Sequence, residues 1–327
     1  MPTHDRSPRV VLVTGASSGI GEAAAHRVAR RGDHLVLLAR GRGALERVAR
    51  DCDGLGAAST TVVTADISND DEVGAAVSGV VAQHGWIHTV IGSAGVVAYG
   101  RVEDVPAEVF DQVVATNLLG SVNLARHVMP VMRTQGSGSI VVVGSVIGHV
   151  AVPDMAAYVV SKWGVRALVR QLRVDNRDRP GVRIEYVAPG GVDTPIYRQA
   201  ATYGDAAGRP PFPVTSPERI AARALAVADG RRRGGQVGLA NEVIRFGFTA
   251  VPWAYDRLVG PLFSVAAQDQ TVEVRPSPGN VLQSRDELNG LRGGHGNALL
   301  AIGANVVELA RLRVRGGRPP RPHHKPG

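Results

Sequence analysis

The sequence predicts an α/β fold built on a Rossmann-type, doubly wound parallel sheet. Short apolar runs alternate with longer helical patterns from residue 9 to about 240, and this alternation is typical of parallel strands covered on both faces. A glycine-rich loop follows the first strand and opens the first helix. The chain has 327 residues, of which 44% are hydrophobic and 20% charged, so it can form a large globular core.

The predicted elements follow one another regularly in this part of the chain. We expect about seven strands, which occupy residues 10–14, 35–39, 61–64, 90–91, 140–143, 182–187 and 236–239. Helical patterns lie between them at residues 19–31, 44–51, 70–84, 108–133, 154–177 and 217–229. Ligands of such a sheet bind at the carboxyl ends of its strands. The residues that directly follow each strand are therefore the candidates for a site.

The alternation stops after about residue 240, which divides the chain into three parts. Residues 1–240 form the predicted catalytic domain, and residues 241–270 form a helical, aromatic-rich extension. Residues 271–327 comprise a linker, a short amphipathic helix over 297–312 and a basic tail that we expect to be disordered. The aromatic residues of the extension are Phe246, Phe248, Trp253, Tyr255 and Phe263. They predict a wall of the substrate pocket, with a subunit interface and a membrane surface as alternatives.

The net charge of +8 raises the question of an anionic partner. Residues 281–327 hold eight Lys and Arg but only three acidic residues, so much of the excess lies in the tail and no nucleic acid partner is expected. The single cysteine, Cys52, excludes an internal disulfide and a cysteine-rich zinc site, and no metal is expected. We find neither a signal sequence nor a run of about 18 apolar residues. These features predict a cytoplasmic protein, with peripheral membrane contact of the C-terminal region left open.

The loop after the first strand reads T-G-A-S-S-G-I-G over residues 14–21. Glycines let the backbone turn sharply and approach a ligand, and the N-terminus of the next helix offers free N–H groups to a pyrophosphate. An ordinary glycine-rich turn is the alternative, but the position between the first strand and the first helix favours dinucleotide binding. The contacts expected in this loop come from Gly15, Ser17, Ser18, Gly19 and Ile20.

Tyr158 and Lys162 lie four residues apart in a helical pattern, which places them on one face of the helix. A free phenol has a pKa near about 10, and a neighbouring ammonium lowers that pKa and suits the phenol to proton transfer. Lys162 is also the only lysine before Lys325. A solvated helix face is the alternative, but together with the phosphate loop the pair predicts a catalytic site.

With these motifs the sequence resembles the short-chain dehydrogenase/reductase family, whose members carry T-G-x-x-x-G-x-G and Y-x-x-x-K. The resemblance spans residues 9–240 and implies an oxidoreductase that transfers a hydride between NAD(P)(H) and a carbonyl or alcohol. It assigns catalysis to Asn117, Ser145, Tyr158 and Lys162. Ser145 would bind the substrate carbonyl, and Asn117 would support a proton relay through Lys162 and water. It also implies a homo-oligomer, either a dimer or a tetramer.

Further cofactor contacts follow from the same resemblance. They are Asp66 and Ile67 at the adenine, Ala94 and Gly95 after the fourth strand, Pro189, Gly190, Val192 and Thr194 near the nicotinamide, and the catalytic residues Asn117, Tyr158 and Lys162. Residues 92–95 read G-S-A-G where the family usually has N-N-A-G, so asparagine contacts made by relatives are in doubt. The loop 196–215 is expected to form a mobile lid over the substrate.

The second strand ends in Ala39, at the position that meets the adenosine ribose, and two arginines, Arg40 and Arg42, follow it. An acid there would bind the 2′-hydroxyl, whereas a guanidinium suits a 2′-phosphate. The sequence therefore predicts NADP(H) rather than NAD(H), with a solvated surface arginine as the alternative. The substrate class is expected to be a hydrophobic carbonyl compound such as a ketone, a 3-oxoacyl compound or a steroid-like molecule. A catalytically weak dinucleotide sensor and a membrane-associated adaptor are the alternative functions.

Overall fold

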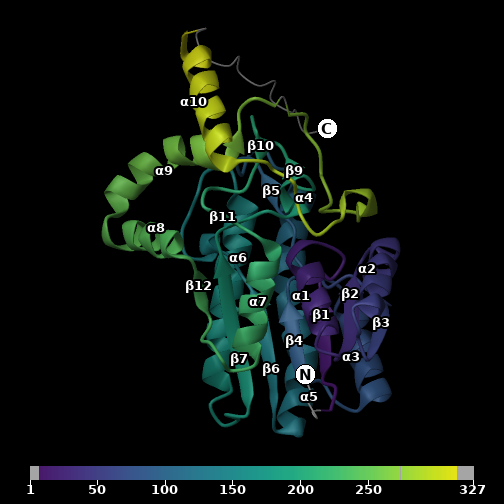
Figure 1. Ribbon diagram of the computed structural model, residues 1–327. Helices are drawn as coiled ribbons and strands as arrows, with labels where there is room; N and C mark the ends of the chain where they lie inside the picture. The colour runs from purple at the N-terminus through teal and green to yellow at the C-terminus, as the bar shows by residue number, and fades with distance from the viewer. Residues whose placement is uncertain (1–6, 273, 315–327) are drawn as a thin grey trace, which may run out of the picture.

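Helices cover both faces of a seven-stranded parallel sheet (Figure 1). The computed structural model describes residues 7–272 and 274–314. The strand order is β12-β7-β6-β4-β1-β2-β3, and every pairing within this sheet is parallel. The chain order reverses between β1 and β4, which creates the crevice where such sheets bind ligands. The predicted doubly wound fold is confirmed.

The elements have the following bounds. The strands of the main sheet are β1 (Val10–Thr14), β2 (His34–Ala39), β3 (Ser59–Thr64), β4 (Thr89–Gly92), β6 (Gly138–Val143), β7 (Val182–Pro189) and β12 (Gly235–Val237). The helices are α1 (Gly19–Ala29), α2 (Arg42–Gly54), α3 (Asp70–His84), α4 (Ala107–Val114), α5 (Gly120–Gln135), α6 (Ala156–Asp175), α7 (Pro217–Ala228), α8 (Leu239–Ala250), α9 (Pro252–Ala266) and α10 (Ala298–Val314). Two-residue strands are β5 (Ala98–Tyr99), β8 (Gly191–Val192), β9 (Ala201–Thr202), β10 (Ala207–Gly208), β11 (Val214–Thr215) and β13 (Gln268–Asp269).

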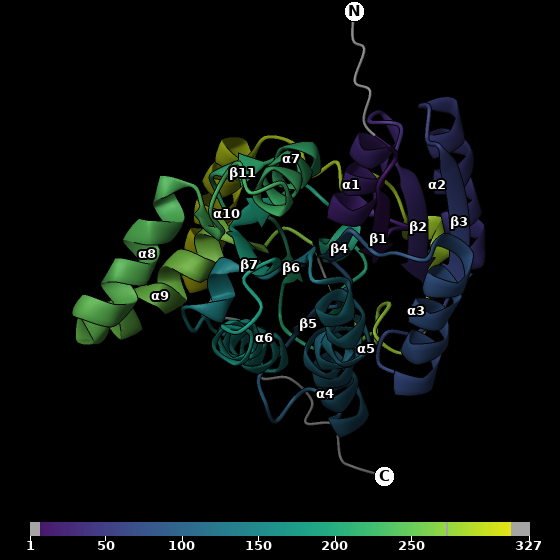
Figure 2. The ribbon, with the colours of Figure 1, turned by 90° about the horizontal axis from the view of Figure 1, so that it is seen from below.

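Two apolar cores flank the sheet, because successive side chains of a strand point to opposite faces. In β1, Val10 and Leu12 pack with residues of α3, α5 and α6, while Val11 and Val13 pack with residues of α1, α2 and α7. Figure 2 shows these two helical layers on either side of the strands. Both cores hold the carboxyl ends of the strands in a fixed plane, and the candidate site lies there.

The helix predicted over residues 108–133 is divided in the structure. A π-helical turn, Ala115–Leu119, separates α4 from α5 and contains Asn117. Such a turn widens the helix by one residue and is frequent at functional sites. The last strand is also shorter than predicted, because it ends at Val237 and the backbone turns at Gly238, where φ is +105°, into α8.

The C-terminal part of the chain extends beyond the sheet. Helices α8 and α9 form a hairpin at one side of the molecule (Figure 1), and α10 confirms the predicted C-terminal helix. Residues 274–296, which belong to the segment predicted as a linker (271–296), run back along the carboxyl edge of the sheet, with one 3₁₀ turn at Asp286–Leu288. In the described ranges, no helix combines the length and apolar character needed to cross a bilayer. The predicted tail from residue 315 onward lies outside them.

Two glycines allow the loop between β1 and α1 to pack tightly. A Cβ on Gly21 would lie 2.1 Å from the carbonyl oxygen of Gly15, and one on Gly15 would lie 2.7 Å from the Cα of Ala94. Gly15 also has a φ of +65°, which favours glycine. The obstructing atoms are backbone atoms, which cannot rotate away as a side chain can. The close approach of loop, helix and β4 therefore depends on these glycines.

We expect Gly21→Ala to lower the free energy of unfolding by about 1–3 kcal/mol, because the added methyl overpacks the loop, and to weaken dinucleotide binding. Gly79→Ala is the matched control, since a Cβ on Gly79 in α3 meets nothing within 4 Å, and it should stabilise the helix slightly. Urea unfolding of both variants measures the difference. Equal stabilities of the two variants would contradict this account of the loop.

Candidate active site

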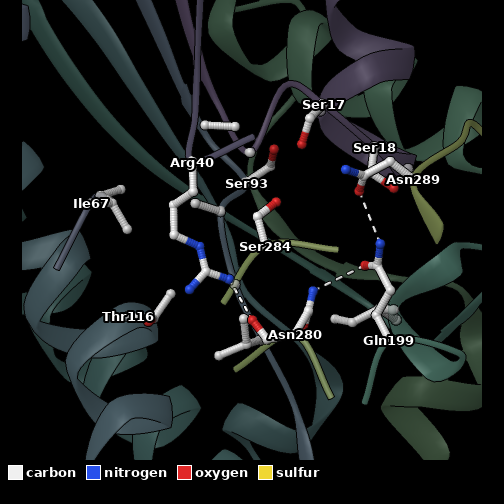
Figure 3. Close-up of a pocket in the computed structure, with 18 of the residues that line it drawn as sticks. Ser17, Ser18, Arg40, Ile67, Ser93, Thr116, Gln199, Asn280, Ser284 and Asn289 are labelled. Atoms are coloured by element: carbon white, nitrogen blue, oxygen red, sulfur yellow. Dashed lines mark hydrogen bonds between the residues drawn. The ribbon is translucent and has the colours of Figure 1, made fainter. Parts of the chain in front are cut away.

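Two adjoining cavities open at the carboxyl ends of the strands. The first has a volume of about 890 Å³ including the solvent at its mouth. It is bounded by the β1–α1 loop, the ends of β2, β3 and β4, and a segment from the C-terminal region (Figure 3). The second has a volume of about 860 Å³ on the same measure and lies toward α6 and α9. The residues lining both are Ile20, Ser93, Gly95, Thr194 and Ile196. The cavities therefore form one continuous cleft.

The structure brings nearly all of the predicted site residues to this cleft. The first cavity is lined by Gly15, Ser17, Ser18, Gly19, Ile20, Arg40, Asp66, Ile67, Ala94, Gly95 and Thr194. The second is lined by Ile20, Gly95, Ser145, Tyr158, Lys162, Pro189, Gly190, Val192 and Thr194. Asn117 lines neither cavity in the described structure. The first cavity has the place and shape of a dinucleotide site, and the second contains the proposed chemistry.

Residues 277–295, which we call the C-terminal strap, form the outer wall of the first cavity. At the phosphate loop, the Gly19 N–H and the Ser18 hydroxyl donate to the Gly290 carbonyl at 2.9 and 3.0 Å. Farther along, Gln199 donates to the Asn289 side chain at 2.9 Å and accepts from Asn280 at 3.1 Å (Figure 3). The strap is thus held along the length of the dinucleotide cavity.

Arg40 connects the strap to the end of β2. Its guanidinium donates to the carbonyl oxygens of Asn280 and Val281 at 2.5 and 3.0 Å and lies 4.0 Å from the carboxylate of Asp66. Burial lowers the pKa of Arg40, and the carboxylate of Asp66 opposes that shift. Two neutral carbonyls orient the guanidinium without neutralising its charge, so the charge remains directed at the adenosine end of the cavity.

Unused hydrogen-bonding groups in the first cavity fit an adenosine. Asn280 lines this cavity, and its Oδ1 atom is buried and has no hydrogen-bond partner. A buried acceptor that lacks a donor lowers the stability of the folded protein. An adenine amino group or a ribose hydroxyl would supply the missing donor. Ser284 and Arg285 of the strap also line this cavity. Together with the glycine-rich loop, these groups are suited to hold NAD(P)(H).

Tyr158 and Lys162 meet on one face of α6, as predicted. The Lys162 Nζ lies 5.5 Å from the centre of the Tyr158 ring and 3.4 Å from the carbonyl oxygen of Val143. Burial lowers the pKa of Lys162 from 10.5 to about 8. The sequence predicts that the Lys162 ammonium lowers the pKa of Tyr158, but burial instead raises this pKa well above its ordinary value, and only the hydrogen bond with Ser145 opposes that shift. The phenol of the free protein is therefore a proton donor at neutral pH.

Ser145 is fixed by a residue that the sequence did not single out. The Tyr186 hydroxyl donates to the Ser145 carbonyl at 3.2 Å and accepts from the Ser145 N–H at 3.3 Å. Gly144 makes room for this tyrosine, because a Cβ there would lie 2.1 Å from the ring. The Ser145 hydroxyl accepts from the Ile147 N–H at 3.2 Å and lines the second cavity. Its lone pairs and proton are thus positioned beside Tyr158.

Asn117 lies buried behind the cleft, with 1% of its surface exposed. Its Oδ1 accepts from the Val96 N–H at 2.8 Å, and its Nδ2 donates to the Val96 carbonyl and the Ser161 hydroxyl, both at 2.9 Å. Ser161 in turn donates to the Tyr158 carbonyl at 2.9 Å. Asn117 therefore ties the π-helical turn to both the β4 loop and the catalytic helix. A relay from Asn117 through water to Lys162 stays a prediction.

The predicted lid, residues 196–215, is paired at three places. β9 pairs with β5, β10 pairs with β13 and β11 pairs with β8. Ile196, Tyr197, Arg209 and Pro211 of this segment line the second cavity, so the segment covers the predicted substrate position. Its pairing with β13 means that the C-terminal extension helps to place it.

The aromatic residues of the extension divide between two environments. Phe263 lines the second cavity, which supports a pocket wall. Phe248 stacks edge-on against Tyr255 and Trp163 at ring distances of 5.1 and 5.9 Å. The remaining two, Phe246 and Trp253, are 69% and 75% exposed. The cluster is thus partly a pocket wall and partly an uncovered apolar surface.

Sequence reasoning missed the strap and several residues of the second cavity. The missed residues are Tyr186, Tyr197, Gln199, Arg209, Asn280, Ser284, Arg285 and Asn289. The strap has a loop-like composition, and nothing in its local pattern indicates what it packs against. The available signal was its pair of asparagines among glycines, which suits close contact between backbone and ligand.

Comparisons with known proteins agree with this geometry. A profile of the short chain dehydrogenase family matches residues 9–203. The chain is 37% identical over 191 residues to 2-(R)-hydroxypropyl-CoM dehydrogenase of Xanthobacter autotrophicus, covering 58% of this chain and 76% of that protein. It is 36% identical over 195 residues to sepiapterin reductase of Chlorobaculum tepidum, covering 58% and 79%.

Solved structures show the same relationship. The alcohol dehydrogenase of Thermococcus sibiricus, complexed with 5-hydroxy-NADP, has a TM-score of 0.60 and 29% identity, covering 71% of this chain and 95% of that one. A metagenomic short-chain oxidoreductase in complex with NADP has a TM-score of 0.60 and 29% identity, covering 70% and 95%. The sequence motifs, the fold and these similarities together show that the chain belongs to the short-chain dehydrogenase/reductase family of oxidoreductases.

Proposed function

We propose that the protein is an NADP(H)-dependent oxidoreductase that interconverts a carbonyl group and an alcohol. The observation that carries the proposal is the meeting of Ser145, Tyr158 and Lys162 in a cavity continuous with the glycine-rich dinucleotide cavity. Ser145 and Tyr158 can hold and protonate an oxygen atom, and the adjoining cavity can present a hydride donor to the neighbouring carbon. A catalytically weak sensor would not need this complete set of groups.

The chain's residues bind and orient the reactants. A bound reduced nicotinamide would supply the hydride. Thr194 lines both cavities and Val192 lines the second, and the two residues would hold the nicotinamide end. The Ser145 hydroxyl would donate a hydrogen bond to the carbonyl oxygen and hold the carbonyl carbon toward that end. Apolar walls around this position exclude water from the reacting atoms.

Tyr158 would deliver the proton. As the carbonyl oxygen gains negative charge, the phenol transfers its proton to that oxygen, and Lys162 stabilises the phenolate that remains. Lys162 is buried, with only 6% of the residue's surface exposed. In such surroundings its charge acts strongly on a neighbouring phenolate. In the reverse direction the phenolate accepts the proton of an alcohol.

The preference for NADP(H) rests on the adenosine end of the first cavity. β2 ends in uncharged Ala39, and Arg40 directs its guanidinium at this region together with Arg285 of the strap. Two arginines suit a 2′-phosphate, which carries negative charge and several acceptor oxygens. Two similar structures were solved with NADP or a derivative of it, which supports the same preference.

The walls of the second cavity indicate the class of substrate, and the exposed surface of α8 and α9 indicates the partner. The second cavity is walled by residues such as Val97, Met155 and Phe263, which favours a hydrophobic ketone, a 3-oxoacyl compound or a steroid-like molecule. The apolar surface on α8 and α9, which includes Phe246 and Trp253, favours a homo-oligomer. Peripheral attachment to a membrane is the alternative for this surface. We place the protein in the cytoplasm.

Tyr158→Phe should reduce kcat for carbonyl reduction by about 100-fold or more, since removing general acid catalysis typically costs that much. Binding of NADPH should change little, because the variant removes a single hydroxyl. Turnover is measured from NADPH oxidation with a panel of ketones, 3-oxoacyl thioesters and steroids, and binding is measured by calorimetry. Near-normal turnover in this variant would exclude Tyr158 as the proton donor.

The activity should fall as pH rises through the pKa of Lys162. The ammonium is present below about pH 8 and lost above it, because burial lowers this pKa from 10.5 to about 8. We therefore expect kcat/KM for NADPH, which reports groups of the free enzyme, to decrease with increasing pH in this region. Lys162→Met should remove this decrease along with most of the activity. A wild-type profile that rises across the same region would contradict the role of the ammonium.

Arg40→Gln should weaken NADPH binding about 10-fold or more while leaving NADH binding almost unchanged, since a charge-assisted hydrogen bond contributes roughly 1.5–3 kcal/mol. Glutamine retains an N–H donor for the carbonyls of the strap. Arg42→Gln is the matched control, because Arg42 pairs with Glu46 at 2.7 Å and has 76% of its side chain exposed. Titration calorimetry with NADPH and with NADH measures the two affinities in each variant. If the ratio of the NADPH and NADH affinities is the same in Arg40→Gln as in the wild type, Arg40 does not bind the 2′-phosphate, and the argument for NADP(H) over NAD(H) is lost.

A further inference from the structure

Arg209 is a buried cation in the wall of the second cavity. Only 4% of its surface is exposed, and it lines the same cavity as Ser145 and Tyr158. Its Nε is buried without a hydrogen-bond partner. Within residues 7–272 and 274–314, Arg209 also takes part in none of the ion pairs between basic and acidic side chains. The side chain therefore places a positive charge and free N–H donors in an enclosed space.

An arginine in such a position is costly to the free protein. Transferring a charge from water to a protein interior carries a penalty of several kcal/mol unless a counter-charge or hydrogen bonds compensate for it. Arg40 and Arg173 show the usual solutions, since each donates to backbone carbonyls and approaches an acidic residue. Arg209 has neither kind of partner among the described groups. A ligand that enters the cavity is the remaining source of acceptors.

The fold holds Arg209 firmly at this place. Its backbone N–H donates to the Ala267 carbonyl at 2.9 Å, directly after β10 pairs with β13. The preceding residue, Gly208, packs against the ring of Tyr99, where a Cβ would lie 2.2 Å from ring carbon. The backbone is thus fixed from both sides, and Arg209 cannot reach solvent by a simple shift of a surface loop.

The surroundings do not provide the missing negative charge. Tyr99, Tyr197 and Phe263 supply aromatic walls to the cavity. His295, whose pKa is affected by the charge of Arg209, is kept neutral by burial, which lowers its pKa. Arg209 is also absent from the lining of the dinucleotide cavity. The expected counter-charge therefore belongs to the substrate and not to the phosphates of the cofactor.

We propose that the substrate carries an anionic group, such as a carboxylate, that binds to Arg209 while its carbonyl oxygen lies between Ser145 and Tyr158. This inference rests on the proposed function and specifies its substrate class. The intervening part of the substrate is apolar, because the walls between these groups are aromatic and aliphatic. Arginine suits the role because its planar donors match the two oxygens of a carboxylate. Arg209 is thereby a specificity-determining residue.

The test uses the full-length protein and a series of methyl ketone acids from 4-oxopentanoate to 8-oxononanoate, each paired with its neutral methyl ester. Varying the chain length varies the separation between carbonyl and carboxylate. Calorimetry on the NADP⁺ complex measures binding, and NADPH oxidation measures kcat/KM. At the best length we expect the acid to exceed its ester by about 10-fold or more in both measurements, as for hydrogen bonds to charged groups.

Arg209→Gln removes the charge but keeps a polar side chain of similar length. It should abolish the preference for the acid, lowering kcat/KM for the acid by about 10–100-fold and that for the ester by less than about 3-fold. Arg198→Gln is the matched control, because Arg198 lies on the same segment and is exposed. Thermal unfolding and NADPH binding verify that each variant is folded. Should Arg209→Gln fail to fold, Arg209→Lys is used, which should retain a reduced preference for the acid.

The outcomes separate this inference from the proposed function. If no acid exceeds its ester at any length, or if Arg209→Gln keeps the wild-type preference, the inference is wrong. Because calorimetry does not require turnover, a preference for acids that depends on Arg209 would support the anion site even in a protein that fails to transfer hydride. Conversely, turnover of neutral ketones that is lost in Tyr158→Phe would support the reaction while overturning the anion site.

Discussion

The burial of positive charge at the carboxyl edge of the sheet is the constraint on which the site depends. Lys162, Arg40 and Arg209 all lie in or beside the cleft. Lys162 and Arg40 are oriented by backbone carbonyl groups, and Arg40 has a carboxylate only at 4.0 Å. Carbonyl dipoles hold a cation in place without cancelling its charge. Buried cations of this kind are costly until anionic ligands arrive, so the same feature that weakens the free protein favours binding.

The effect of this charge on Tyr158 explains why the family uses a tyrosine and a lysine together. In the free protein, burial raises the pKa of the phenol and lowers that of the ammonium. Both groups are thereby driven toward their neutral forms. A charge that develops on the substrate oxygen reverses the balance, because a phenolate and an ammonium stabilise each other in a poorly polarisable site. Lys162 therefore stabilises the Tyr158 phenolate that remains when the proton moves to the substrate. Before that step the phenol is neutral, and the ammonium has little effect on it.

Local patterns were sufficient to predict the sheet and to single out Ser145, Tyr158 and Lys162, which line one cavity. The helix over residues 70–84 matches α3 to the residue, because its caps and its apolar period are both local signals. Tyr158 and Lys162 were predicted from their spacing taken together with the glycine-rich loop, and both signals are local. The π-helical turn at Asn117 was missed, since it results from hydrogen bonds between Asn117, Val96 and Ser161, which lie far apart in the sequence. No periodicity encodes such contacts.

The C-terminal strap was misinterpreted for a related reason. Its glycines and asparagines resemble those of a linker, and its order comes from partners such as Ser18, Arg40 and Gln199, between about 80 and 270 residues away in the chain. The same holds for Arg209. As one of 37 basic residues, it has no distinguishing neighbour in the sequence. Only the pairing of β10 with β13 and the packing around Tyr99 reveal that it is buried.

Arg209 and the missed residues of the strap lie beyond the region that the family profile matches. The family profile ends at residue 203, and the four residues predicted to be catalytic lie before that point. Arg209, Phe263 and the strap all lie after it. The extension supplies β13, which pairs with β10 beside Arg209, and the strap that follows it lines the first cavity. One continuous segment therefore contributes to both cavities, so a change in how it packs would alter cofactor and substrate binding together while leaving the catalytic groups in place.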